Sequence, residues 1–70
     1  MKIEFSHHVI ERLHQRGIPL NDIIQTIKFP DWYEEAKGGK IMCNKVINEA
    51  SLTVIYAITK SGIEIIAAYY

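Results

Sequence analysis

Residues 6–18 read Ser-His-His-Val-Ile-Glu-Arg-Leu-His-Gln-Arg-Gly-Ile and hold the start, the body and the end of a helix. Ser6 is a favourable N-cap residue, and Gly17 suits the left-handed position that follows the last turn of a helix. Between them, apolar residues recur at helical spacing: Val9, Ile10 and Leu13. The pattern therefore predicts an amphipathic helix over residues 6–16.

The same segment carries a row of cationic side chains. His8, Arg12 and Arg16 are spaced four residues apart, so they stack along one side of the predicted helix. At about 100° per residue, this row lies beside the apolar stripe rather than opposite it. A cationic row at the edge of a buried face can line a cleft, and we therefore expect the functional site here.

The rest of the chain predicts a second helix followed by strands. Four apolar residues repeat at the helical period: Leu20, Ile23, Ile24 and Ile27. Pro19 suits the first turn of this helix, and Pro30 ends it. From Asp31 onward the period changes to two and predicts strands over residues 32–36, 40–47, 52–59 and 63–69. Residues 2–5 are a candidate leading strand.

This order of elements predicts an α+β fold in a single domain over residues 1–70. We expect two N-terminal helices packed on one face of a three- to four-stranded antiparallel β-meander. In the strand over residues 52–59, the face with Thr53, Ile55 and Ala57 is also largely apolar, whereas a one-sided sheet alternates more cleanly. The second face is therefore expected to bind a partner, either another copy or a different protein, unless edge loops cover it.

The charge balance and the cysteine content limit the partners and the location of this chain. Eight acidic and eight basic residues give a formal net charge of zero over 70 residues, which argues against broad coating of nucleic acid but permits a local cationic site. Cys43 is the only cysteine, so no intramolecular disulfide forms and a reducing cytoplasm is expected. No stretch resembles a signal peptide or a membrane span, so we expect a cytoplasmic protein without a membrane partner.

The cationic row has the chemistry that phosphodiester cleavage of RNA requires. The donor forks of Arg12 and Arg16 match phosphate oxygens, and His8 can exchange a proton near neutral pH. Such cleavage needs one group that moves a proton and another that neutralises charge growing on the phosphate. Alternatively, the arginines form structural ion pairs and His8 caps a helix end. Candidate carboxylates for such pairs are Glu11, Glu34 and Glu35.

Three other features of the sequence could carry chemistry. Tyr69 ends the last predicted strand, where its hydroxyl can reach into a cleft, although a half-buried aromatic at a strand end is the alternative. His7, Glu11 and His14 share another helix face and resemble a ligand set for divalent metals. Because that face points away from the apolar stripe, we expect it to be solvated, with no metal or other cofactor. Cys43 is expected to be a small strand residue rather than a nucleophile.

One motif extends over the whole first helix: Ser6-x-His8-Val9-x-x-Arg12-x-x-x-Arg16-Gly17-Ile18. An amphipathic helix and a run of strands follow it, and the last strand closes on Ala68-Tyr69. With this order, the chain resembles a family of small bacterial domains of unknown function, in which the segment reads Ser-x-His-Ala-x-x-Arg-x-x-x-Arg-Gly-Ile. Members of that family are similar to RelE/ParE-like toxins and to barnase-like ribonucleases.

This resemblance implies two helices against an antiparallel sheet, with an active cleft on the sheet. It also implies a toxin–antitoxin setting, in which a neighbouring protein blocks the toxin. Carried over residue by residue, it points to four positions: His8, Arg12, Arg16 and Tyr69. The leading hypothesis is a toxin-like domain that cleaves RNA without a metal. His8 would be its general acid or base, the arginines would hold the phosphate, and Tyr69 would orient the substrate.

The competing hypothesis is a non-catalytic module that binds a protein or associates with itself through the second face of the sheet. In that case, Arg12 and Arg16 have a structural role. The two hypotheses differ in what replacement of Arg12 does, because a structural arginine is needed for folding and a phosphate-binding arginine is not.

Overall fold

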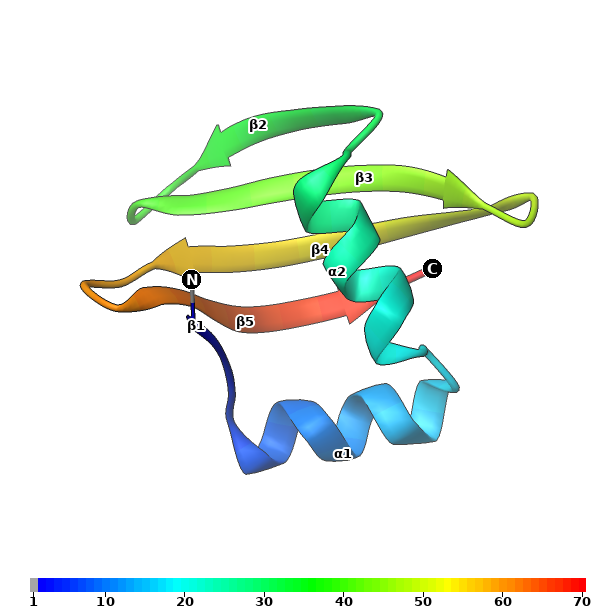
Figure 1. Cartoon of the computed structure of the whole chain (residues 1–70), viewed down its shortest axis with the longest axis horizontal. Coiled ribbons are helices and arrows are strands. Elements are labelled where there is room, and N and C mark those ends of the chain that lie inside the picture. The colour runs from blue at the N-terminus through cyan, green and yellow to red at the C-terminus, as the bar shows by residue number, and fades with distance from the viewer. Residues whose placement is uncertain (1) are drawn as a thin grey trace.

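A computed structural model describes residues 2–70 of the chain. Two helices and five strands follow one another in the order β1 (Lys2–Phe5), α1 (His7–Arg16), α2 (Leu20–Lys28), β2 (Trp32–Ala36), β3 (Lys40–Ile47), β4 (Ala50–Ile58) and β5 (Gly62–Tyr69). All five strands form one sheet in the order β1-β5-β4-β3-β2. In Figure 1, α2 crosses the sheet over β3 and β4, and α1 runs beside β5.

The mixed sheet corrects the predicted fold class. The sequence pattern predicts a three- to four-stranded antiparallel β-meander, but the sheet has five strands, and β1 pairs with β5 in parallel from Lys2↔Gly62 to Phe5↔Ile65. The prediction is wrong because alternation shows that a segment is extended but not which strand it pairs with. Strands from opposite ends of a chain share no turn, so no local signal marks their pairing. The same correction applies to the antiparallel sheet that the resemblance implies.

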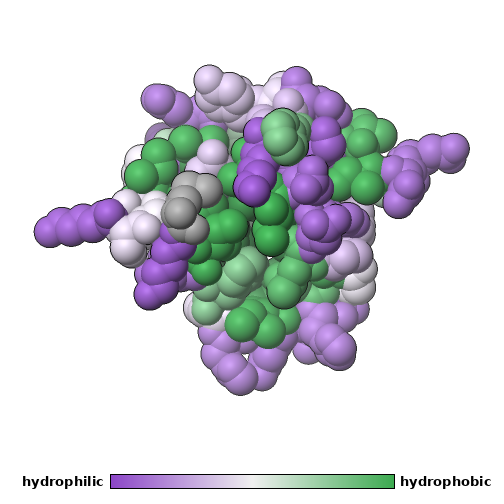
Figure 2. All heavy atoms as spheres, viewed as in Figure 1, coloured by the Kyte–Doolittle hydropathy of each residue, from purple (hydrophilic) through white to green (hydrophobic). Residues whose placement is uncertain are grey.

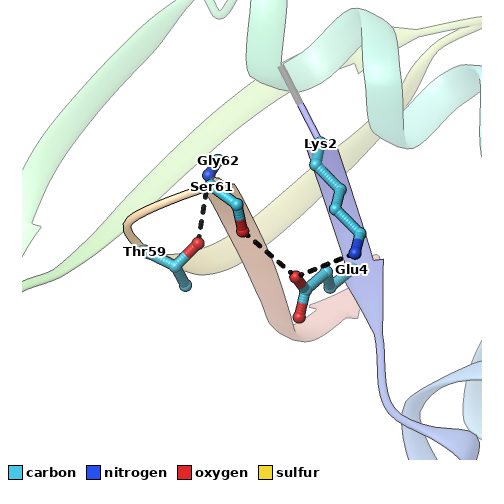
Figure 3. Close-up of polar contacts among 5 residues, drawn as sticks. All are labelled: Lys2, Glu4, Thr59, Ser61 and Gly62. Atoms are coloured by element: carbon cyan, nitrogen blue, oxygen red, sulfur yellow. Dashed lines mark hydrogen bonds and ion pairs between the residues drawn. The ribbon is translucent and has the colours of Figure 1, made fainter.

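Gly62 permits the close approach of β1 to the start of β5 (Figure 3). The backbone N–H of Lys2 donates to the Ser61 carbonyl oxygen at 3.3 Å, and the Ser61 hydroxyl donates to the Glu4 carboxylate at 3.4 Å. A Cβ atom at position 62 would clash with the backbone of Lys2. Only glycine avoids this clash, so β1 docks against β5 because residue 62 has no side chain.

The first helix begins and ends through the caps that the sequence predicts. The Ser6 hydroxyl accepts a hydrogen bond from the Val9 N–H at 3.1 Å, which satisfies one of the free donors of the first turn. Gly17 adopts the left-handed conformation, with φ at 64°, and ends the helix. Val9 and Leu13 are buried, so α1 packs its apolar stripe into the core.

The core lies between the helices and one face of the sheet. Its largest fully enclosed side chains are Ile23, Thr26, Cys43, Leu52, Val54 and Ile65. The buried Thr26 hydroxyl donates to the Asp22 carbonyl oxygen at 2.8 Å, so α2 enters the core without an unpaired polar group there. Seen from the helix side, apolar atoms gather in the middle of the surface and polar side chains surround them (Figure 2). No helix within residues 2–70 has the length and apolar character needed to cross a membrane.

The stability of this core is expected to fall in alkaline solution because of Cys43. Burial raises the pKa of the Cys43 thiol from 9.0 to about 11, so the folded protein holds this proton more tightly than the unfolded chain. The stabilising contribution is complete below about pH 9 and is lost as the pH rises through about 11. Urea denaturation across this window measures the loss. Cys43→Val, which cannot titrate, is the control, and an equal pH dependence in both proteins would contradict the assignment.

Candidate functional site

A cleft of about 290 Å³ opens between α1 and the second half of β5. Side chains from both elements line it: His8, Val9, Arg12, Leu13, Arg16, Ile66, Ala67, Ala68 and Tyr69. The cationic row of α1 therefore faces a cavity rather than open water. Tyr69, which is far from His8 in the sequence, lines the same cavity, so all four residues singled out by the sequence lie around one space.

The pairing of β5 explains why this cleft exists. β1 pairs only with residues 62–65 of β5, so the residues that follow have no strand beside them on that side. Ile55 and Tyr56 are adjacent on β4, but their partners on β5 are Ala67 and Ile65. Ile66 lies between these partners, has no Cα partner of its own and forms a β-bulge. After Phe5 the chain turns into α1, which runs beside β5 (Figure 1).

The two arginines of the cleft are held differently. Nη1 of Arg16 donates to the Ala68 carbonyl oxygen at 2.8 Å, and this bond fastens the last turn of α1 to β5. Within residues 2–70 there are two ion pairs, and neither includes an arginine: Lys2–Glu4 and His7–Glu11. The pairs that the structural alternative requires, with Glu11, Glu34 or Glu35, are not among them. Arg12 is thus available to a ligand.

Among residues 2–70, those that line the cleft include cationic side chains and no carboxylate. His8, Arg12 and Arg16 are exposed, and Tyr69 is 39% exposed, so a ligand can reach all four. Guanidinium groups on one side of a cavity attract an anion, and each can bind two phosphate oxygens through its fork of donors. The cleft is therefore a local cationic site on a chain whose formal charges balance overall.

The alternative metal set does not assemble. Nε2 of His7 lies 3.0 Å from the Glu11 carboxylate on the exposed surface of α1. His14 lines a separate, mainly apolar groove that includes Phe5. Among the residues that the structure describes, no three His, Cys, Asp or Glu side chains gather closely enough to hold a metal ion. Cys43 is a buried free thiol that is not part of the cleft lining.

The wall that β5 contributes to the cleft is the part that sequence reasoning missed. Ile66, Ala67 and Ala68 line this wall, and the Ala68 carbonyl group binds Arg16. The available signal is a pair of adjacent isoleucines, Ile65 and Ile66, which break the alternation of the strand and mark a bulge. A break of this kind identifies the stretch of β5 that is free to face the helix.

Replacing Arg16 with alanine is expected to lower the free energy of unfolding by about 1 kcal/mol, because the bond to the Ala68 carbonyl group is lost. Arg12→Ala is expected to change it by less than about 0.5 kcal/mol, as at other exposed positions without a partner. Urea denaturation of the two variants measures the difference. Equal losses would mean that the Arg16 bond does not fasten α1 to β5.

The fold and the cleft together define a small domain with two helices, a mixed sheet and a cationic cavity beside its last strand. A family model described as "Domain of unknown function (DUF4258)" matches residues 5–70. The chain belongs to this family, in agreement with the resemblance to a small family of unknown function. No curated protein and no solved structure matches the chain.

Proposed function

We propose that this protein is a toxin-like endoribonuclease that cleaves RNA in the cleft between α1 and β5 and needs no metal ion. The proposal rests on one observation, the convergence of His8, Arg12, Arg16 and Tyr69 on a single cleft. A proton-transfer group beside anion-binding groups is the set that phosphodiester cleavage requires. The first-helix motif resembles a family that is related to RelE/ParE-like toxins and barnase-like ribonucleases, and this resemblance favours the same class of reaction.

The proposed reaction uses the 2′-hydroxyl group of RNA as the nucleophile. Its oxygen attacks the neighbouring phosphorus atom, and the bond from phosphorus to the 5′-oxygen of the next nucleotide breaks. The products are a 2′,3′-cyclic phosphate and a 5′-hydroxyl group. His8 takes the proton from the attacking hydroxyl or gives one to the leaving oxygen, and water exchanges the other proton. The Tyr69 hydroxyl orients the substrate or assists this proton transfer.

The arginines supply positive charge where negative charge grows on the phosphate. Arg12 binds the phosphate oxygens, because its guanidinium group is exposed and has no ion-pair partner among residues 2–70. Arg16 is held by the Ala68 carbonyl group and presents its remaining donors from a fixed position. Two guanidinium groups can neutralise the developing charge that a metal ion neutralises in other nucleases. This is why the proposal includes no metal.

The proposed setting is the cytoplasm, where an antitoxin protein would block the cleft until RNA cleavage is needed. The free thiol of Cys43 is compatible with a reducing compartment of this kind. An antitoxin that covers the cleft would have to place acidic or other anionic groups against the cationic row.

Growth after induced expression tests the proposal. The wild-type protein is expected to arrest growth, whereas the His8→Ala, Arg12→Ala double variant at the same soluble level is expected not to. The purified protein is expected to cleave an oligoribonucleotide in the presence of a chelator and to leave the matching oligodeoxyribonucleotide intact, since DNA lacks the attacking hydroxyl. Equal growth with both proteins and no cleavage would overturn the proposal and favour the non-catalytic binding module.

A further inference from the structure

The sheet has a second face that the helices leave uncovered. Buried side chains such as Cys43 and Val54 point toward the helices, so their neighbours along each strand point the other way. The register places these neighbours in rows, with Trp32, Asn44, Thr53 and Tyr69 in one row and Met42, Ile55 and Ala67 in the next. We call this surface the open face. Within residues 2–70, both helices pack on the other side and all strands belong to the sheet, so no element covers it.

The open face is more apolar than a solvated sheet face normally is. Two of its large side chains are well exposed: Trp32 (47%) and Val46 (57%). Tyr69 ends the same row as Trp32 but also lines the cleft, so it is left outside the surface proposed to be covered. Met42, Ile55 and Ala67 lie across the middle strands. Contiguous exposed apolar surface on a small domain marks an interaction site.

Three polar side chains near one end of the open face bond one another: Asn44, Ser51 and Thr53. Nδ2 of Asn44 donates to the Ser51 hydroxyl at 2.8 Å and to the Thr53 hydroxyl at 3.1 Å. Asn44 is only 6% exposed although no element lies above it. Covering a polar group costs little when its hydrogen bonds are already made inside the protein. The open face can therefore be buried without leaving this cluster unpaired.

We propose that a second copy of this chain covers the open face, so that two sheets pack face to face about a two-fold axis with the helices outside. At about 4.8 Å between strands and about 3.3 Å per residue, the sheet has a projected area of roughly 550 Å². Its accessible surface area is larger, because the side chains project from the sheet. This approaches the ~800 Å² per partner of a stable interface. Two twisted sheets that bring their apolar faces together pack in this way, about 10 Å apart.

The charges of the open face are compatible with a second copy of this chain. The open face carries carboxylates, including Glu34 and Glu64, together with Lys40. A two-fold interface brings the same set of residues from each copy together, and a mixed set does not repel itself as a single-sign set would. The formal net charge of zero also removes long-range repulsion between two copies.

Sedimentation equilibrium of the full chain at increasing protein concentration tests the proposal. A monomer–dimer equilibrium is expected. Trp32 reports where the partner lies, because it is the only tryptophan and is half-exposed on the open face. Its fluorescence emission is expected to shift to shorter wavelength as the dimer forms, since burial removes water from the indole ring. A protein that remains monomeric at every concentration would overturn the proposal.

Two isoleucines on β4 provide a matched test of the face that is used. Ile55→Lys places a charge at the centre of the open face and is expected to raise the dimer dissociation constant roughly 30-fold, as loss of an interface hot spot does. Ile58→Lys makes the same change on the opposite face, at a site 66% exposed, and is expected to leave the constant unchanged. Trp32→Lys repeats the test if Ile55→Lys fails to fold. An unchanged dimer dissociation constant in the Trp32→Lys variant, or in an Ile55→Lys variant that folds, would overturn the proposal.

Discussion

Replacement of His8 by alanine is expected to lower the rate of RNA cleavage by ~10²–10⁴-fold, the usual contribution of a proton-transfer group. The fold is expected to remain intact, because His8 is exposed in the first turn of α1 and its ring has no ion-pair partner among residues 2–70. Arg12 stays in place in this variant, so substrate binding should change less than cleavage. Single-turnover cleavage of an oligoribonucleotide measures the effect, and circular dichroism checks folding.

His14→Ala is the matched control for this experiment. His14 is another exposed histidine of α1, but it lines the separate groove rather than the cleft, so its replacement is expected to leave cleavage unchanged. His7 is less suitable, because its ring pairs with Glu11. Wild-type activity in His8→Ala would remove His8 from the reaction. Equal loss in both variants would indicate damage to α1 instead of a missing proton-transfer group.

The second large effect is expected in the core. Leu52 on β4 is fully buried, so Leu52→Ala removes packed methyl groups and leaves a cavity under the helices. The free energy of unfolding is expected to fall by ~2–5 kcal/mol, a large part of the 5–15 kcal/mol that is typical of a folded domain. A chain of 70 residues buries a smaller share of its surface than a larger domain does, so this variant is expected to be largely unfolded at growth temperature.

Leu20→Ala makes the same chemical change at a position that is 55% exposed at the start of α2. Its free energy of unfolding is expected to stay within about 1 kcal/mol of the wild type. Urea denaturation followed by circular dichroism gives both free energies. The dependence of the free energy of unfolding on urea concentration shows whether each variant unfolds as one unit. Similar losses for the two leucines would mean that Leu52 is not at the packed centre of the fold.

Local signals account for the parts of the fold that the sequence predicts correctly. Ser6 and Gly17 cap α1 through bonds to residues only a few positions away, and such bonds leave a direct trace in the sequence. The pairing of β1 with β5 depends instead on contacts between opposite ends of the chain. Gly62 carries part of that information, because a side chain at this position would clash with β1. In the sequence, however, a glycine that permits close packing looks the same as a glycine in an ordinary turn.

The site shows the same division between local and distant information. Helical spacing groups His8, Arg12 and Arg16, because residues four apart share a helix side in any tertiary fold. That this row faces a cleft depends on where β1 stops and on the bulge at Ile66, which together set the place of α1. The bond from Arg16 to Ala68 needs both elements in position, and no pattern within one element predicts it.

The parallel pairing of β1 with β5 also sets the order in which the molecule assembles during synthesis. Within residues 2–70, β1 is made before the other elements, yet the one strand that it pairs with, β5, is made after them. Contacts between distant segments close long loops and slow folding, so the sheet is completed last at this edge. Before β5 is made, a nascent chain has the cationic row of α1 but lacks the wall of the cleft that β5 supplies, so the proposed activity cannot begin until β5 is in place.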